Sequence, residues 1–140
     1  MRNSTYFAHS IRVLIQLLKV VITASIYQQN HKPMDNSRKL FFIVVNDLYG
    51  YMPLRFKDKV KQGDFYRYIQ DRRKEIGEPY TSIKTSQLKD EEFARFVEAF
   101  IRFTYSNVIG YYYDIENIQI ISKNIEKKIK KLIGEDWNNG

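Results

Sequence analysis

The most informative part of this chain is SIRVLIQLLKVVITASIYQQ (Ser10–Gln29), in which apolar residues occupy almost every side of a helix. Its polar side chains, with the histidine just before it, recur at intervals of three and four residues: His9, Arg12, Gln16, Lys19 and Thr23. Side chains at that spacing form one narrow stripe along a helix. A helix with a single polar edge is typical of the centre of a bundle or of one half of an oligomer interface. We therefore expect this stretch to be the central helix of the fold.

Two other interpretations place the same stretch at a membrane. A transmembrane helix needs about 20 apolar residues, and Arg12, Gln16 and Lys19 interrupt the run. A secretory signal needs an unbroken apolar core before small residues. Residues 23–25 are small, but Lys19 lies inside the core. We expect a cytoplasmic protein, with membrane targeting or export by residues 1–30 as the minor alternative.

An ambiguous apolar run follows the loop around Pro33. The Asp35–Ser37 cluster supplies helix-capping chemistry. Leu40–Val45 suits a buried strand by its β-branched and aromatic content, or a helix that continues through Tyr49 and ends at Gly50. We favour the helix because no partner strand is evident nearby.

Capping and stop residues, together with apolar residues at helical spacing, predict two further helices. Asp64 can cap a helix over Phe65–Ile76 that Gly77 stops, with Phe65, Ile69 and Ile76 on its apolar stripe. Acidic residues at 90–92 open a helix over Lys89–Ser106. Its apolar residues recur with helical spacing: Phe93, Phe96, Val97, Phe100 and Phe103.

The last part of the chain predicts one clear helix. Residues 111–121 alternate enough to form a small hairpin, or else a loop that enters the next helix. Ser122–Ile133 predicts a basic amphipathic helix that Gly134 stops, with Ile125, Ile129 and Leu132 facing inward. Residues 1–8 and 135–140 are expected to be frayed. The fold class is therefore mainly α, a bundle-like single domain over 1–140 with four to five helices, and with a small β-hairpin near 108–121 as an open alternative.

Residue usage argues against most enzymatic chemistry. The chain has no cysteine and only two histidines, which excludes disulfide scaffolds, thiolate metal sites and cysteine nucleophiles. No phosphate-loop, dinucleotide-binding or nucleophile-elbow motif occurs. The carboxylate pairs Glu91–Glu92 and Asp114–Glu116 are explained by helix capping and turn chemistry. The run Tyr111–Tyr113 lacks the neighbouring histidine that tyrosine-based strand transfer needs. We expect no enzyme, no catalytic, metal or cofactor site, and no small-molecule substrate.

The formal charge of +7 at pH 7 raises the possibility of a nucleic-acid partner. Part of this charge follows from composition, because abundant Ile, Lys and Asn with little Ala are typical of a low-GC genome, such as that of a bacterium, a phage or a mobile element. The candidate contacts are two basic stretches whose side chains could meet phosphates. The first stretch also contains Tyr66 and Tyr68, which could stack on unpaired bases. Their basic residues are Arg55, Lys57, Lys59, Lys61, Arg67, Arg72, Arg73 and Lys74, and then Lys127, Lys128 and Lys131.

The aromatic content is high for so short a chain. Eleven Tyr, nine Phe and one Trp in 140 residues exceed what one small core is expected to hide, and aromatic residues are favoured at interfaces. The expected interface residues are Leu14, Leu18, Val21, Tyr111, Tyr112 and Tyr113. We therefore expect a non-enzymatic protein-interaction or assembly module that binds itself or another protein. The alternative is a small basic nucleic-acid-binding protein, either a regulator or a packaging factor.

Overall fold

The computed structural model describes residues 12–20, 33–81 and 90–138, and no strand occurs in these ranges. Residues 12–20 are helical. The chain then forms α2 (Pro33–Gly50), α3 (Leu54–Lys59), a 3₁₀ turn (Gln62–Asp64) and α4 (Phe65–Glu75). The remainder comprises α5 (Asp90–Phe103), the π-helix η3 (Thr104–Ile109), α6 (Gly110–Tyr112) and α7 (Ile115–Asn138). The predicted mainly α fold is confirmed.

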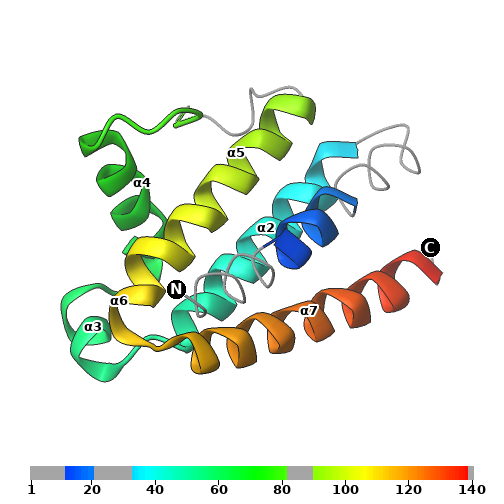
Figure 1. The fold of residues 1–140 in the computed structure, drawn as a ribbon. Coiled ribbons are helices and arrows are strands. Elements are labelled where there is room, and N and C mark those ends of the chain that lie inside the picture. Colours follow the sequence, from blue (N-terminus) through cyan, green and yellow to red (C-terminus); the bar gives the residue numbers. More distant parts are fainter. Residues whose placement is uncertain (1–11, 21–32, 82–89, 139–140) are drawn as a thin grey trace.

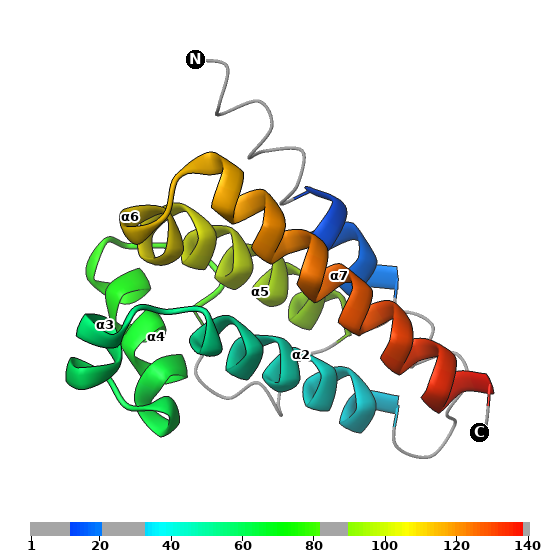
Figure 2. The same ribbon diagram turned by 90° about the horizontal axis from the view of Figure 1, so that it is seen from below.

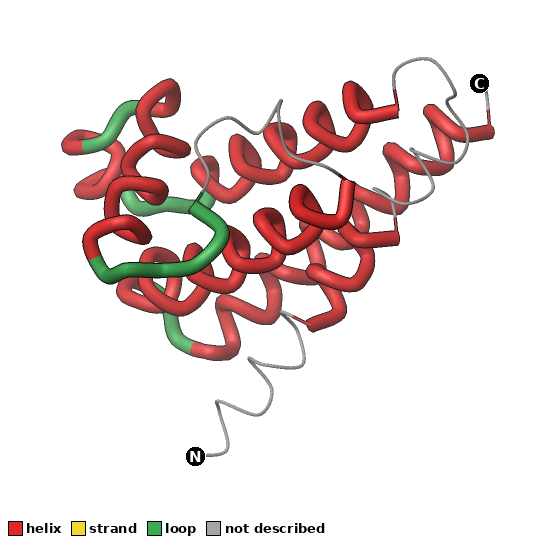
Figure 3. The backbone as a smooth tube through the Cα atoms, turned by 90° about the horizontal axis from the view of Figure 1, so that it is seen from above, coloured by secondary structure: helices red, strands yellow, loops and turns green. Residues whose placement is uncertain are grey.

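The long helices lie along one another, and the short ones cover one end. Helices α2 and α7 run side by side (Figures 1 and 2), and Lys128 Nζ in α7 lies 2.7 Å from Asp47 Oδ1 in α2. Helices α3 and α4 form the end at which α2 finishes and α6 begins. Figure 3 shows these helices as a tube, with the described loops between them in green. No helix in the described ranges is long and apolar enough to cross a membrane.

A network of aromatic rings fills the core. Phe41 of α2 is its centre, with edge-to-face contacts to Phe93, Phe96 and Phe100 of α5 at centroid distances of 6.0, 5.7 and 5.1 Å. A second group joins α3, α4 and α2, where Phe56 lies 5.7 Å from Phe65 and Tyr49 lies 5.2 Å from Phe65. Such pairs are favourable beyond the area that they bury. The expectation that the aromatic residues exceed the core is therefore wrong for most of those described.

The first helix is less central than expected. Within residues 12–20, Leu14, Ile15 and Leu18 are buried on one face, whereas Val20 is 53% exposed. Leu14 and Leu18 were expected at an interface between molecules, but they lie in the core of this chain. Their i, i+4 spacing directs both toward the bundle. Val21, His9, Thr23 and the rest of the predicted 20-residue helix lie outside the described residues.

The small hairpin that the sequence left open as an alternative near 108–121 does not form. Asp114 begins α7 instead, because its Oδ1 accepts a hydrogen bond from the backbone N–H of Asn117 at 3.0 Å. The helix therefore starts seven residues earlier than predicted and buries Ile118 and Ile121 on the same stripe as Ile125. It also continues past Gly134 to Asn138, through residues that we expected to be frayed.

The remaining helix predictions differ in detail. Leu40–Val45 lies in a helix that ends at Gly50, as favoured, although α2 begins already at Pro33. Gly77 ends α4 with a φ of 72°, a conformation that suits glycine. Ile76 is exposed rather than on the buried stripe. Asp64 precedes α4 but makes no capping hydrogen bond, because its carboxylate pairs with Arg67.

Candidate interaction site

The described residues contain no cluster of three or more potential metal ligands. His9 and His31 lie outside them. The carboxylates of Glu91 and Glu92 are exposed in the first turn of α5.

The basic stretch Arg55–Lys74 does not form one continuous cationic face. Arg73 is fully buried, so its guanidinium cannot contact a phosphate backbone. Arg67 Nη2 lies 3.2 Å from Asp64 Oδ1, and Arg72 Nη1 lies 3.4 Å from Glu75 Oε1. Lysines alternate with other residues over 57–61 and would share one edge of an extended chain, but Leu54–Lys59 is helical, so they do not line up in this way.

The tyrosines of this stretch are engaged within the chain. The Tyr66 ring stacks on Phe100 with centroids 5.3 Å apart, and burial raises the pKa of its hydroxyl to about 12, although the charge on Arg73 acts in the opposite direction. Tyr68 packs against Phe56 at 5.3 Å, and the Arg72 guanidinium covers its ring at 4.4 Å. Neither ring offers an open face of the kind expected for base stacking.

The lysines of α7 lie on a different surface. Lys127, Lys128 and Lys131 are exposed on the helix that runs along the opposite side of the bundle from α4 (Figure 1). Lys128 is paired with Asp47. The two predicted basic regions are therefore separate in space.

The structure instead joins residues that we assigned to different functions. Arg55 of α3 lies over the Tyr112 ring of α6, with Cζ 4.8 Å from the centroid. The Tyr111 ring contacts Tyr112 edge to face at 5.0 Å, and Tyr111 is 77% exposed. We name Arg55, Tyr111 and Tyr112 the tyrosine–arginine corner. Lys59, one turn after Arg55 in α3, is exposed on the same side of that helix.

Several contacts hold the corner in one geometry. The Tyr113 hydroxyl donates to the carbonyl of Tyr51, which ties the end of α6 to the end of α2. The Tyr49 hydroxyl donates to the Val60 carbonyl at 2.7 Å, which fixes the end of α3. Phe56 supports Tyr112 from below, with ring centroids 5.9 Å apart. The exposed Tyr111 therefore packs against a Tyr112 ring whose position is fixed by the surrounding helices.

The π-helix η3 determines where α6 lies. A Cβ atom at Gly110 would lie 2.8 Å from the Tyr105 carbonyl oxygen, so the chain passes itself too closely for any other residue. Burial raises the pKa of the Tyr105 hydroxyl, although the neighbouring Ser122 side chain acts in the opposite direction. π-Helical turns are rare and occur often at functional sites.

Of the expected interface residues that the structure describes, only Tyr111 is largely exposed. Tyr112 and Tyr113 are half-buried, Leu14 and Leu18 are core residues, and Val21 lies outside the described residues. The contact of Arg55 with Tyr112 could not be expected from the sequence, because the two residues are 57 positions apart.

Comparison of the chain with protein-family models, curated proteins and solved structures finds no match. Function is therefore inferred below from the geometry of the described residues.

Proposed function

We propose that this protein is a non-enzymatic assembly module that associates with further copies of itself through the tyrosine–arginine corner. The observation that carries the proposal is the position of Tyr111. Its ring is exposed to solvent and packs against Tyr112, which Arg55 covers. Tyrosine and arginine are enriched among the residues that contribute most to protein interfaces. A fixed aromatic side chain also loses little conformational freedom on binding.

The charge of the corner favours an acidic contact surface. Arg55 and Lys59 are exposed there, and neither forms an ion pair with another described residue. The chain itself offers carboxylates of the required kind, because Glu91 and Glu92 are exposed at the start of α5 and none of the described cations is paired with them. Complementary charge raises the rate of association and fixes its register.

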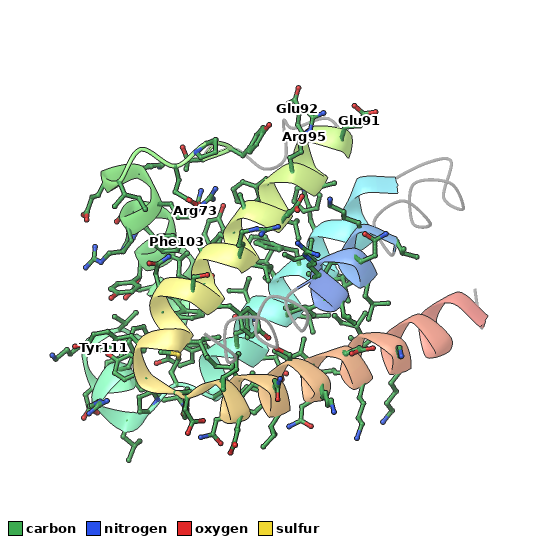
Figure 4. All side chains as sticks on the ribbon, in the orientation of Figure 1. Arg73, Glu91, Glu92, Arg95, Phe103 and Tyr111 are labelled. Atoms are coloured by element: carbon green, nitrogen blue, oxygen red, sulfur yellow. The ribbon has the colours of Figure 1, made fainter. Side chains whose placement is uncertain are left out.

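The two surfaces lie at opposite ends of the molecule. In Figure 4, Glu91 and Glu92 stand at one end of α5, and Tyr111 stands beside α3 at the other. Contact between the corner of one copy and the α5 start of the next is therefore head to tail. Head-to-tail contacts generate rings or filaments rather than closed two-fold dimers.

Light scattering on paired charge-reversal variants tests this proposal. We expect wild-type protein to exceed the monomer mass at micromolar concentration. Two double variants, Arg55→Glu with Lys59→Glu and Glu91→Lys with Glu92→Lys, should each be monomeric. Mixed together they should associate again with the two variants in alternation, because the unchanged charges pair at one contact and the reversed charges pair at the next.

A control variant changes the same charge elsewhere. Lys123→Glu with Lys127→Glu alters the exposed side of α7 and should leave association unchanged. A wild-type protein that stays monomeric at all concentrations would overturn the proposal, as would charge-reversal variants that associate like the wild type.

Nucleic-acid binding is a second candidate, and the lysines of α7 favour it. Lys123, Lys127 and Lys131 recur every four residues along an exposed side, and the first two form no ion pair with another described residue. We expect binding to random duplex DNA that weakens with salt, and a salt slope that falls by roughly 2 in Lys123→Gln with Lys127→Gln. Absence of binding at low salt would exclude this candidate.

A further inference from the structure

A pocket of about 510 Å³ lies between residues 78–80, which follow α4, and the consecutive helical segments α5 and η3. Its lining includes Pro79 and Tyr80 on one side and Arg95, Arg102, Phe103 and Asn107 on the other. This pocket is separate from the tyrosine–arginine corner, which lies at the α3 end of the molecule. The sequence alone indicated no small-molecule site here.

Two irregular parts of the backbone border this pocket. Tyr80 has a φ of 55°, a conformation that non-glycine residues rarely adopt, and Asn107 belongs to the π-helix. Backbone strain and π-helical turns both concentrate at binding and catalytic sites. Their meeting at one pocket favours a ligand site over a gap left by imperfect packing.

Buried Arg73 holds the strained segment in place. Its Nη2 donates to the carbonyls of Pro79 and Tyr80 at 2.8 and 3.1 Å, and its Nε donates to Glu78 Oε1 at 3.1 Å. Figure 4 shows Arg73 between α4 and α5, in the interior of the molecule. The wall that carries the Tyr80 ring is therefore preformed.

Two arginines and two glutamates line the pocket, and both glutamates are already paired with cations. Glu98 shares its carboxylate between Lys19 at 2.8 Å and Arg102 at 3.0 Å, so one carboxylate faces two cations. Arg95 lies seven residues before Arg102, hence on the same side of α5, and forms no ion pair with another described residue. Glu91 and Glu92 precede Arg95 by one turn but are not paired with it. Glu78 is committed to Arg73.

We propose that this pocket binds a small organic anion, either a carboxylate or a phosphate, that carries a planar apolar group. The anionic group is held by Arg102 and Arg95, because guanidinium groups recognise both anions with paired hydrogen bonds. The planar group lies between the Tyr80 ring and Phe103. The amide of Asn107 supplies a further polar contact at the π-helical edge.

Amide chemical shifts of the full-length, ¹⁵N-labelled chain test the proposal. The probes are phenyl phosphate and benzoate, with benzyl alcohol as the neutral control and inorganic phosphate as the anion alone. We expect saturable shifts at Tyr80, Arg102 and Asn107 with at least one aromatic anion below about 10 mM. The tighter binder of phenyl phosphate and benzoate identifies the anion as a phosphate or a carboxylate. Benzyl alcohol should bind at least tenfold more weakly than that probe.

Two variants control for folding and for position. Arg102→Gln should weaken binding by about tenfold, whereas Arg72→Gln, which removes an equally exposed and ion-paired arginine from α4, should not change it. No saturable shift with either aromatic anion, equal binding of benzyl alcohol, or full binding by Arg102→Gln would each overturn the proposal. The Arg55→Glu with Lys59→Glu variant should bind the probes like the wild type, so this outcome is independent of self-association.

Discussion

The guanidinium of Arg73 lies over the ring of Phe96, with Cζ 5.5 Å from the ring centroid, and both side chains are fully buried. Burial lowers the pKa of Arg73, whereas the hydrogen bond and the charge of Glu78 raise it. Its Nη1 also donates to Gln70 Oε1 at 2.6 Å. A buried charge is tolerated when it is paired and hydrogen-bonded in this way. Arg73 therefore fastens the end of α4 to α5.

Replacement of Arg73 should destabilise the fold strongly. Arg73→Met removes the cation but leaves Gln70, Glu78 and two carbonyls without their donor, and such a loss costs about 3 kcal/mol. Urea denaturation measures the change in the free energy of unfolding. Arg72→Met, which breaks an exposed pair on the same helix, should cost less than about 1 kcal/mol. Equal effects of the two substitutions would contradict the assigned role of Arg73.

The position of Arg73 shows how sequence analysis can mislead. Phe65, Ile69 and Arg73 recur every four residues, so helical spacing alone places Arg73 on the buried stripe of α4. We assigned it to the surface because it is an arginine, and we put Ile76 on the stripe because it is apolar. In the structure Arg73 is buried and Ile76 is exposed. The chain after Gly77 folds back over Arg73 and supplies the carbonyl groups that accept its hydrogen bonds. No local pattern reveals those acceptors.

The elements that the sequence predicted well are those in which apolar residues recur at helical spacing over several turns. The phenylalanines of α5 and the isoleucines Ile125 and Ile129 of α7 lie in the core as expected. The hairpin stayed open as an alternative because Ile118, Ile120 and Ile121 match alternation and helical spacing almost equally over so few residues. The tyrosine–arginine corner was not predictable as a site, since its parts come from distant segments and depend on where η3 directs α6.

The two tyrosines Tyr66 and Tyr113 should respond oppositely to loss of the hydroxyl. The Tyr66 hydroxyl is buried and has no hydrogen-bond partner among the described residues, whereas the Tyr113 hydroxyl donates to the carbonyl of Tyr51. Tyr66→Phe should leave stability unchanged or raise it by about 1 kcal/mol, and Tyr113→Phe should lower it by about 1 kcal/mol. Thermal and urea unfolding of both variants check the signs. A destabilised Tyr66→Phe would show that its hydroxyl has a partner.

Gly110 should tolerate no side chain. Gly110→Ala places a Cβ atom 2.8 Å from the Tyr105 carbonyl oxygen, so the π-helix or α6 must move. We expect a loss of about 1–3 kcal/mol, typical of overpacking. Gly63→Ala is the matched control, because nothing lies within 4 Å of its added Cβ, and its effect should be near zero. If Gly110→Ala is equally neutral, the close approach to Tyr105 is not required.

The Lys19–Glu98 pair should make stability depend on acid pH. The hydrogen bond from Lys19 lowers the pKa of Glu98, with a smaller contribution from Arg102, and burial opposes both. A carboxyl whose pKa is lower in the folded state stabilises that state above the pKa of the unfolded chain. This contribution disappears as the pH falls through the lower, folded-state pKa. Unfolding experiments between neutral pH and pH 3 should therefore show a smaller loss of stability in Glu98→Gln than in the wild type.

An exposed carboxylate supplies the control for that titration. Glu75→Gln removes a similar charge from the pair with Arg72 on the surface of α4. It should keep the acid dependence of the wild type, because exposed pairs contribute little. A Glu98→Gln profile that matches the wild type throughout would show that Lys19 does not anchor the first helix to α5 by charge.

Leu14 and Val20 separate a core role of the first helix from an interface role. Leu14 is 1% exposed and Val20 is 53% exposed within this single chain. Leu14→Ala should therefore cost about 2–4 kcal/mol in the free energy of unfolding at a protein concentration where the chain is monomeric. Val20→Ala should change it by less than about 0.5 kcal/mol. If Leu14→Ala instead weakens self-association without affecting monomer stability, Leu14 contacts a second copy and the first helix packs differently. Urea denaturation combined with light scattering on the same samples distinguishes these outcomes.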